Sequence, residues 1–388
     1  MTSKSKRTTG GKIRLGMVGG GEGAFIGAVH RLAARLDDRY ELAAGALSSA
    51  PEKSIRSALA LGIDKERAYR SFADMAKAEA GRVDGIEAVA IVTPNHLHAP
   101  VATAFLKAGI HVICDKPLTA TIKEARALHK LVAKSGRIFA VTYNYTGYPM
   151  IRHARRMVEN GDLGEIRLVQ VEYAQDWLTQ SLETSGQKQA AWRTDPKQSG
   201  LGGCIGDIGT HAYHLGCFVS GLELESLCAD LASFVEGREL DDNAHLLLRF
   251  KGGAKGMLWA SQVAPGNRNN LRLRVYGTKG GLDWQQEQPD HLHWSPFGRP
   301  TQMISRGSGA ANAAATRLSR IPAGHPEGYL EGFANIYGEV AKAIVAARKG
   351  RRPDREVIYP GITDGLNGVA FIEAAVKSAA KGGTWVKL

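Results

Sequence analysis

The sequence predicts an α/β protein with two domains. The first is a doubly wound, mostly parallel sheet, and the second is an α+β domain with a large, open, mostly antiparallel sheet. With 388 residues, the chain exceeds the usual size of one hydrophobic core. Strand and helix patterns alternate up to residue 142, and later strands follow one another with few helices between them. We expect domains at 13–145 and 146–388, after a disordered basic tail at 1–12.

Composition disfavours several classes of function. The net charge is +12, but five basic residues lie within the first fourteen, and the others are scattered without interleaved aromatic residues. We therefore expect no nucleic-acid partner. No apolar run approaches the roughly 20 residues of a membrane span, and no apolar signal segment follows the basic start, so we expect a cytoplasmic protein that binds no membrane. The four cysteines lack C-x-x-C spacing, which suits reduced thiols.

The first strand, Ile13–Val18, leads into a glycine-rich turn and a helix that begins near Phe25. This arrangement suits a dinucleotide pyrophosphate, because glycines let the backbone approach closely and the helix start favours negative charge. The alternative is a plain tight turn. Gly19 and Gly21 fit the first two positions of the G-x-G-x-x-G pattern, and Ala24 or Gly23 must take the third. The cofactor candidates here are Gly19, Gly21, Ala24, Phe25 and Ile26.

The second strand, Glu41–Leu47, ends without an acidic residue directly after it. In NAD-binding folds an acid normally bonds the ribose 2′-hydroxyl at this place. The segment 48–54 would not repel the 2′-phosphate of NADP, which Lys53 or Arg56 could meet. Candidate cofactor contacts are Ser48, Ser49 and Lys53, and the choice between NAD and NADP stays open.

Three further strands, Glu87–Val92, Ile110–Cys114 and Ile138–Thr142, are apolar and end in polar residues. Ligands bind at the carboxyl ends of strands in open α/β sheets. The cofactor candidates are Thr93, Pro94, Asn95, His98, Asp115, Lys116 and Asn144. The alternatives are a capped turn around Asn95 and a surface lysine at Lys116. Helices are expected at Gly27–Leu36, Pro51–Leu61, Ser71–Ala80, Asn95–Lys107 and Ile122–Ser135.

The second half begins with a helix at Pro149–Asn160. Strands are predicted at Gly164–Trp177, Glu225–Val235, Asn243–Phe250, Gly256–Gln262, Leu271–Tyr276 and Thr384–Leu388. The segment Gln285–Pro326 is rich in Pro, Gly, Ser and Ala and is expected to be a long loop or arm. Helices are expected at Glu327–Ala347 and Thr363–Lys381, and we expect helix 363–381 to pack back towards the first domain.

Asp207 and His211 lie four residues apart in a segment where a helix is expected to begin near Gly206. At this spacing a carboxylate lies one turn from an imidazole and can raise its basicity, as a general base for a hydroxyl proton requires. A surface helix pair is the alternative. Cys204 and His214 would complete a zinc set, but no dedicated zinc motif is present, and we expect no metal.

Together these motifs resemble the Gfo/Idh/MocA oxidoreductases, the glucose-fructose oxidoreductase and inositol dehydrogenase group. The resemblance spans nearly the whole chain, and the chain looks most like its levoglucosan-type sugar dehydrogenases. It implies a Rossmann domain with substrate held between the two domains, a homodimer or homotetramer, and a slight preference for NAD. It also implies that Lys116, Asp207 and His211 meet at the nicotinamide. His211 would accept a hydroxyl proton, Asp207 would stabilise the imidazolium, and Lys116 would bond the developing carbonyl oxygen.

Two residues depart from the family pattern. Asp115 replaces the usual glutamate, and His214 stands where many members have an aspartate. Candidate substrate contacts are Tyr145, Tyr173, Gln175, Trp177, Arg193, His214 and His325. The leading hypothesis is NAD(P)-dependent oxidation of a ring hydroxyl of a sugar, anhydrosugar or cyclitol. The alternatives are an NAD-dependent glycoside hydrolase that oxidises its sugar transiently, with Arg193 holding an acidic sugar, and a non-catalytic cofactor sensor.

Overall fold

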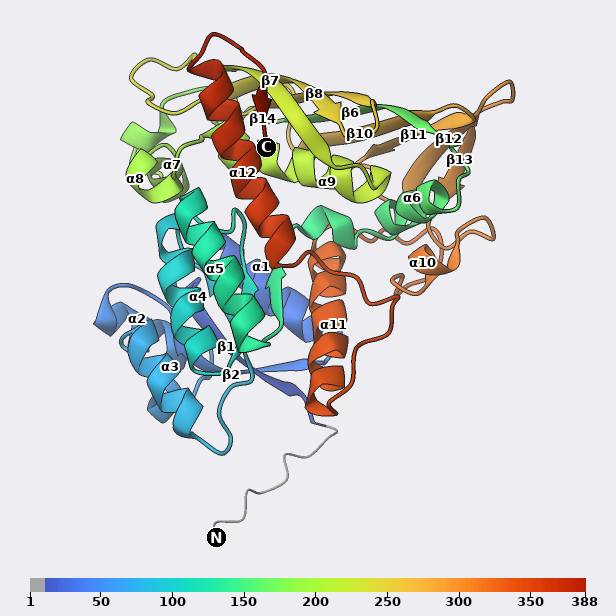
Figure 1. The fold of residues 1–388 in the computed structure, drawn as a ribbon. Coiled ribbons are helices and arrows are strands. Elements are labelled where there is room, and N and C mark those ends of the chain that lie inside the picture. Colours follow the sequence, from blue (N-terminus) through green and yellow to red (C-terminus); the bar gives the residue numbers. More distant parts are fainter. Residues whose placement is uncertain (1–10) are drawn as a thin grey trace.

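A computed structural model describes residues 11–388. Two sheets form two stacked parts of the molecule, with helices between them and around the lower sheet (Figure 1). The tail predicted at 1–12 lies almost wholly outside the described residues. Within residues 11–388, no helix is long and apolar enough to cross a bilayer.

The first sheet has five strands in the order β2-β1-β3-β4-β5, and all its pairs are parallel. Every residue of β3 is buried, because helices cover both faces of the sheet. The Rossmann-like fold predicted for the first half is therefore confirmed. The strands are β1 (Ile13–Gly19), β2 (Tyr40–Ala46), β3 (Ala88–Val92), β4 (His111–Cys114) and β5 (Phe139–Val141).

The helices that follow these strands agree with the sequence pattern to within a few residues. They are α1 (Phe25–Leu36), α2 (Pro51–Ala60), α3 (Phe72–Gly81), α4 (His98–Lys107) and α5 (Ile122–Ser135). Ser71 caps α3 and Thr121 forms a capping box with Glu124 at the start of α5.

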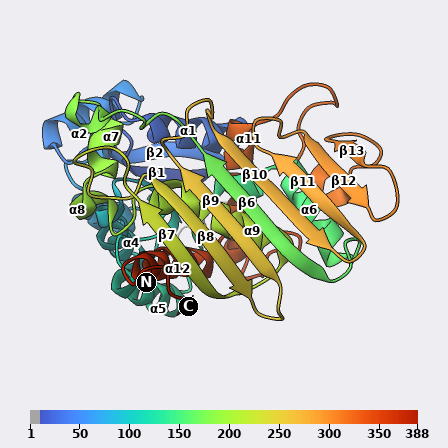
Figure 2. The same cartoon turned by 90° about the horizontal axis from the view of Figure 1, so that it is seen from above.

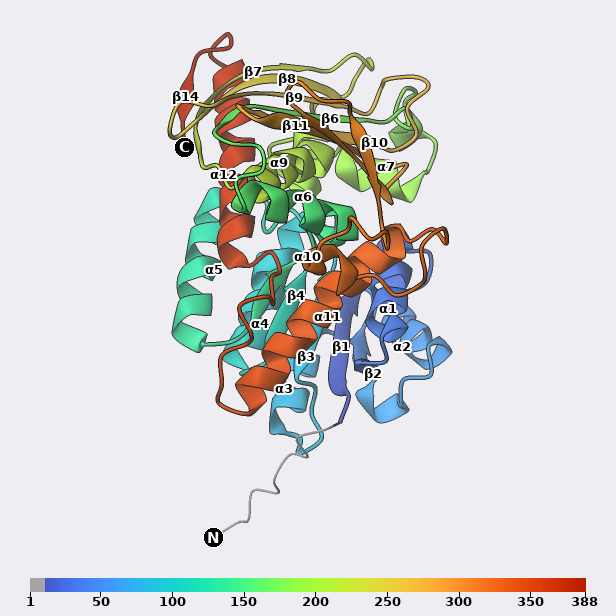
Figure 3. The same ribbon diagram turned by 90° about the vertical axis from the view of Figure 1, so that its right-hand side faces the viewer.

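One face of the first sheet is covered by a helix from the far end of the chain. α11 (Tyr329–Arg348) packs against α1, and its Phe333, Tyr337 and Val340 are buried in one cluster with β1 residues. The boundary at residue 145 stays a prediction, but this part of 146–388 contributes to the core of the first sheet. Figure 3 shows α11 running alongside β1 and β3.

The second sheet has nine strands in the order β13-β12-β11-β10-β6-β9-β8-β7-β14. Among the described strands, only β6 and β9 pair in parallel, so the sheet is mostly antiparallel as predicted. The strands are β6 (Ile166–Ala174), β7 (Leu224–Ala232), β8 (Asn243–Phe250), β9 (Lys255–Ser261), β10 (Asn270–Gly277), β11 (Gly280–Gln285), β12 (His291–Pro296), β13 (Gln302–Ser305) and β14 (Val386–Lys387).

The described helices that cover this large sheet lie on its inner face (Figures 2 and 3). They are α6 (Pro149–Glu159), α9 (Thr210–Ser220) and α12 (Ile362–Ala379). α12 contacts both β7 and α5, so it joins the two layers. Two short helices, α7 (Lys188–Arg193) and α8 (Pro196–Ser199), lie in a segment for which no helix was expected.

The prediction that Gln285–Pro326 is a loop or arm is wrong in part. The segment holds β12 and the edge strand β13, and the short helix α10 (Ala313–Thr316). These strands are short and are joined by Pro and Gly turns, so their sequence period is too brief to detect. The buried Arg306 anchors the rest of the segment through Asp290 and Glu327.

Candidate active site

A cavity of about 660 Å³ opens at the carboxyl edge of the first sheet. Its walls are the glycine turn after β1, the ends of β2, β3 and β4, and residues of α7 from the other side. Asp207, which belongs to the second half of the chain, also lines the cavity. The predicted residues that line it are Gly19, Gly21, Ala24, Ile26, Ser48, Ser49, Lys53, Thr93, Pro94, Asn95, Asp115, Lys116, Arg193 and Asp207.

The glycine turn fits a dinucleotide pyrophosphate. Gly19 has a φ of 81°, and a Cβ on it would lie 2.8 Å from the carbonyl oxygen of Val92. In the G-x-G-x-x-G pattern, the third glycine lets the helix pack closely against the backbone before it. Neither Ala24 nor Gly23 makes this close contact here. It belongs to Gly27, where a Cβ would lie 2.4 Å from the Cα of Gly20. Because backbone occupies that space, only glycine fits there without a shift.

The side chain of Phe25 does not line this cavity; it is 62% exposed. At the end of β2, Ser48, Ser49 and Lys53 line the cavity, and their contact with a cofactor stays a prediction. Arg70 also lines it and pairs with Glu52 at 2.9 Å, a contact that no sequence motif indicated. Among the cavity-lining residues of 46–53, no carboxylate is present.

After β3, Asn95 donates a hydrogen bond of 2.8 Å to the carbonyl of Ser199 and so links the first domain to α8. His98 has a different role from the predicted one. It is fully buried, and its ring nitrogens lie 2.8 Å and 2.9 Å from the carbonyls of Pro117 and Thr93. It therefore ties two strand ends together behind the cavity. Two buried polar atoms that line the cavity, Thr93 Oγ1 and His96 Nδ1, have no hydrogen-bond partner within residues 11–388.

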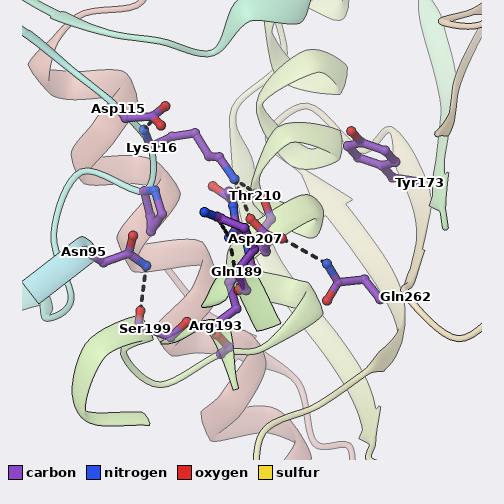
Figure 4. Close-up of polar contacts among 12 residues, drawn as sticks. Asn95, Asp115, Lys116, Tyr173, Gln189, Arg193, Ser199, Asp207, Thr210 and Gln262 are labelled. Atoms are coloured by element: carbon purple, nitrogen blue, oxygen red, sulfur yellow. Dashed lines mark hydrogen bonds and ion pairs between the residues drawn. The ribbon is translucent and has the colours of Figure 1, made fainter. Parts of the chain in front are cut away.

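Lys116 extends from the end of β4 to Asp207, which belongs to the second half of the chain (Figure 4). Its Nζ lies 2.9 Å from Asp207 Oδ1 and also donates to the carbonyl oxygen of Asp207. Asp115 is held separately, because its Oδ1 accepts hydrogen bonds from Lys116 N and Thr142 Oγ1. The position of the lysine is thus fixed at both ends.

Asp207 is the centre of a network of donors. Its Oδ2 accepts from Arg193 Nε at 3.1 Å and from Gln262 Nε2 at 2.9 Å. Burial alone would raise the pKa of Asp207, but the charges of Lys116 and Arg193 outweigh it and hold this pKa well below its usual range. Asp207 is therefore a carboxylate at any working pH.

The helix expected from Gly206 begins differently. Asp207 lies in a π-helical turn, Ile205–Gly209, that precedes α9. The Asp241 carboxylate holds this turn by accepting from the backbone N–H groups of Gly203 and Ile205. Asp207 and His211 are therefore not one turn apart in a single regular α-helix. The hydrogen bonds of the Asp207 carboxylate go to Lys116, Arg193 and Gln262, so its expected effect on His211 comes through charge.

His211 lies at the start of α9 and is 8% exposed. Its ring contacts Tyr145 edge-on, with 4.9 Å between ring centroids, and it also contacts Tyr143 and Tyr173. Burial lowers the pKa of His211 well below 6.5, and the charge of Lys116 lowers it further, while Asp207 opposes both. The imidazole is therefore neutral, which is the form that accepts a proton.

The predicted substrate residues fall into two groups. Tyr145, Tyr173 and Gln175 share a hydrogen-bond network around Asn269, and Trp177 donates to Gln175. Arg193 stacks on Trp192 and bonds Asp207 and Gln189. By contrast, His214 is buried and does not line the cavity. The exposed His325 bonds through its backbone, with its carbonyl accepting from Arg306 and its N–H donating to Pro322.

Sequence reasoning missed Gln262, Asn269 and Gln189. Gln262 directly follows β9, and this position was the only available signal, because the residue itself belongs to no motif.

Asn144, a predicted cofactor contact, does not line the cavity; it is 2% exposed, and its Nδ2 has no partner within residues 11–388. Within the same residues, no group of three or more His, Cys, Asp or Glu side chains is placed to hold a metal ion.

Two family models match the chain in its two halves. Residues 13–143 match the oxidoreductase family with the NAD-binding Rossmann fold, and residues 151–283 match the GFO/IDH/MocA C-terminal domain. The chain belongs to the Gfo/Idh/MocA oxidoreductases. This Gfo/Idh/MocA member is therefore an oxidoreductase of an NAD-binding family, as predicted. In its structure, the glycine turn and the cavity are suited to hold the cofactor.

Solved structures and curated proteins of the family resemble the chain over nearly its full length. An oxidoreductase from Sinorhizobium meliloti is 58% identical, with a TM-score of 0.90 and coverage of 97% of this chain and 100% of the other. An inositol dehydrogenase homolog from Azotobacter vinelandii, complexed with NADH and myo-inositol, is 37% identical, with a TM-score of 0.90 and coverage of 97% and 98%. Levoglucosan dehydrogenase of Pseudarthrobacter phenanthrenivorans is 28% identical over 96% of this chain and 97% of its own.

Proposed function

We propose that this protein oxidises a ring hydroxyl of a sugar, anhydrosugar or cyclitol to a ketone, with NAD or NADP as hydride acceptor. The observation that carries the proposal is the contact between Lys116 and Asp207 across the cavity, with the neutral His211 four residues further along the chain. The named relatives that bind or oxidise inositol and levoglucosan support the substrate class.

The residues of this chain would divide the work in a definite way. The glycine turn and the start of α1 would hold the pyrophosphate, and Thr93, Asn95 and Asp115 line the cavity on the way to Lys116. The nicotinamide supplies the hydride acceptor when it is bound. His211 takes the hydroxyl proton, because burial keeps its imidazole neutral.

Lys116 stabilises negative charge on the substrate oxygen as the proton leaves. Asp207 holds the ammonium of Lys116 in place and partly balances its effect on His211. The polar groups of Tyr173, Gln175 and Asn269 suit the hydroxyls of a ring, and the edge-on Tyr145 supplies an apolar wall beside His211.

The test is a panel of polyols that includes myo-inositol, levoglucosan and glucose, with absorbance of the reduced nicotinamide followed for NAD and NADP separately. We expect reduction with at least one cyclitol or pyranose, and a loss on the order of 100-fold or more in His211→Ala. No reduction with any member of the panel would refute the proposal. Aglycone release from aryl glycosides without net reduction would favour the glycoside hydrolase instead.

A further inference from the structure

An arginine of α1 bonds the backbone of the glycine turn after β1. Arg31 Nη1 donates a hydrogen bond of 2.7 Å to the carbonyl oxygen of Gly20 and lies 3.5 Å from Met17 Sδ. Helix side chains lean towards the amino end of their helix, which lets Arg31 reach back from the second turn of α1 to its start. Within residues 11–388, no other group donates to this oxygen. Arg31 is therefore the side chain that directs this carbonyl.

Arg31 approaches the turn from outside the cofactor cavity. Gly20 lines that cavity, and Arg31 does not. Arg31 instead lines a second cavity of about 510 Å³, together with Arg35 and Tyr40. The hydrogen bond thus draws the carbonyl oxygen of Gly20 away from the place that suits the pyrophosphate. This direction matters, because a carbonyl oxygen carries partial negative charge, whereas an anion needs N–H groups beside it.

The backbone itself offers little resistance to a rotation of this peptide. The peptide joins Gly20 to Gly21, and the two residues before the bond, Gly19 and Gly20, have positive φ values of 81° and 72°. Glycine adopts positive and negative φ with similar ease, so a rotation of the peptide costs little strain. At the N–H end, Gly21 donates a hydrogen bond of 3.1 Å to the carbonyl of Leu47. Two hydrogen bonds, one at each end, therefore hold this peptide, and Arg31 supplies one of them.

No carboxylate competes for the guanidinium of Arg31. Of the two acids that line the second cavity, Asp38 pairs with Lys12, and Glu41 forms no ion pair within residues 11–388. Burial and the charge of Arg35 lower the pKa of Arg31, but a guanidinium stays charged despite such a shift. The bond to Gly20 is thus a charge-assisted hydrogen bond, which is stronger than a bond between neutral groups.

We propose that Arg31 is a positioning residue for the cofactor, because it keeps the Gly20 carbonyl out of the pyrophosphate site. The turn is thereby held in the shape that accepts an anion before the cofactor arrives. Arg31 needs no contact with the cofactor for this role, and the role does not depend on which substrate is oxidised. The rival explanation is that α1 attracts the cofactor through its positive charge, whichever residue carries that charge.

Three variants separate the two explanations. Arg31→Met removes both the hydrogen bond and the charge, and Arg31→Lys keeps the charge with a shorter reach. Arg35→Met is the matched control, because Arg35 lies on the same helix and lines the same second cavity without bonding the turn. Binding of NADH and NADPH is measured by calorimetry. Binding of adenosine, which lacks the pyrophosphate, is measured by ligand-observed NMR.

We expect the Kd of the better-bound dinucleotide to rise about tenfold or more in Arg31→Met, and by less in Arg31→Lys. In Arg35→Met it should rise by less than about twofold. Adenosine should bind the wild type and all three variants equally, because the change is confined to the turn.

Three results would overturn the proposal. Unchanged dinucleotide binding in Arg31→Met would show that the turn keeps its shape without the arginine. An equal loss in Arg31→Met and Arg35→Met would favour the general charge of α1. Weaker adenosine binding in Arg31→Met would indicate a wider structural defect.

A second measurement tests the geometry itself. In a crystal structure of Arg31→Met we expect the Gly20 carbonyl to be rotated towards the cofactor cavity. A carbonyl that keeps its wild-type direction would overturn the role of Arg31, even if dinucleotide binding were weaker. A wild type that bound neither NADH nor NADPH would refute the proposed function, and the direction of this carbonyl would still decide whether Arg31 holds the turn.

Discussion

Lys116 Nζ lies 2.9 Å from Asp207 Oδ1, so an ammonium from the end of β4 and a carboxylate from the turn before α9 form an ion pair across the cavity. Both side chains are mostly buried, at 13% and 15% exposure, which makes this pair less screened by water than a surface pair. It is a charged contact between the two halves of the chain at the site where we place the chemistry.

Replacing Lys116 by Met removes the ammonium and keeps most of the side-chain length. We expect kcat to fall on the order of 100-fold, because one donor to the developing negative charge is lost. Steady-state reduction of the nicotinamide measures this. Lys123→Met, at an exposed position in α5, is the control and should behave as wild type. A Lys116→Met enzyme with full kcat would contradict the role given to the lysine.

The acid limb of the pH profile reports on His211. Burial and the charge of Lys116 lower its pKa well below 6.5, so the neutral base persists as the pH falls through 6.5. We expect kcat/KM to stay level there and to decline only at clearly lower pH. In Lys116→Met one lowering charge is gone, so the limb should move to higher pH. A wild-type limb at or above pH 6.5 would count against His211 as the base.

The approach of α1 to the glycine turn depends on Gly27. A Cβ there would lie 2.4 Å from both the Cα and the carbonyl oxygen of Gly20, so Gly27→Ala must displace the turn. We expect the Kd for NADH to rise about tenfold or more, as measured by calorimetry. Gly338→Ala in α11 is the control, since its Cβ would meet only Asp37 at 3.6 Å. Unchanged NADH binding in Gly27→Ala would show that the turn tolerates the shift.

The placement of polar residues at one sheet edge was predictable from sequence. Parallel strands end at the same edge, so the residues after β1, β2, β3 and β4 had to gather there. The sequence alone did not indicate that Gly27 takes the third glycine role, because the turn between β1 and α1 is longer than the standard motif allows. Spacing to Gly21 was therefore a poor guide, and only the backbone contact identifies the residue.

Contacts between distant segments were beyond sequence patterns. Lys116 and Asp207 are 91 residues apart, and their meeting was expected from family resemblance alone. The π-helical turn at Ile205–Gly209 depends on the Asp241 carboxylate, which lies in another segment, so no local pattern indicates it. The helical spacing of 327–347 likewise predicted a helix without showing which sheet it covers.

The packing of α11 on the first sheet has a consequence for how the protein is made. Buried residues of α11, among them Phe333, Tyr337 and Val340, complete a cluster whose other buried members come from the first third of the chain, with Ala140. During synthesis the amino-terminal segment must wait, with one side of its sheet only partly covered, until the ribosome has released α11, which ends at Arg348. We therefore expect this segment to be the part of the nascent protein that most needs chaperone protection.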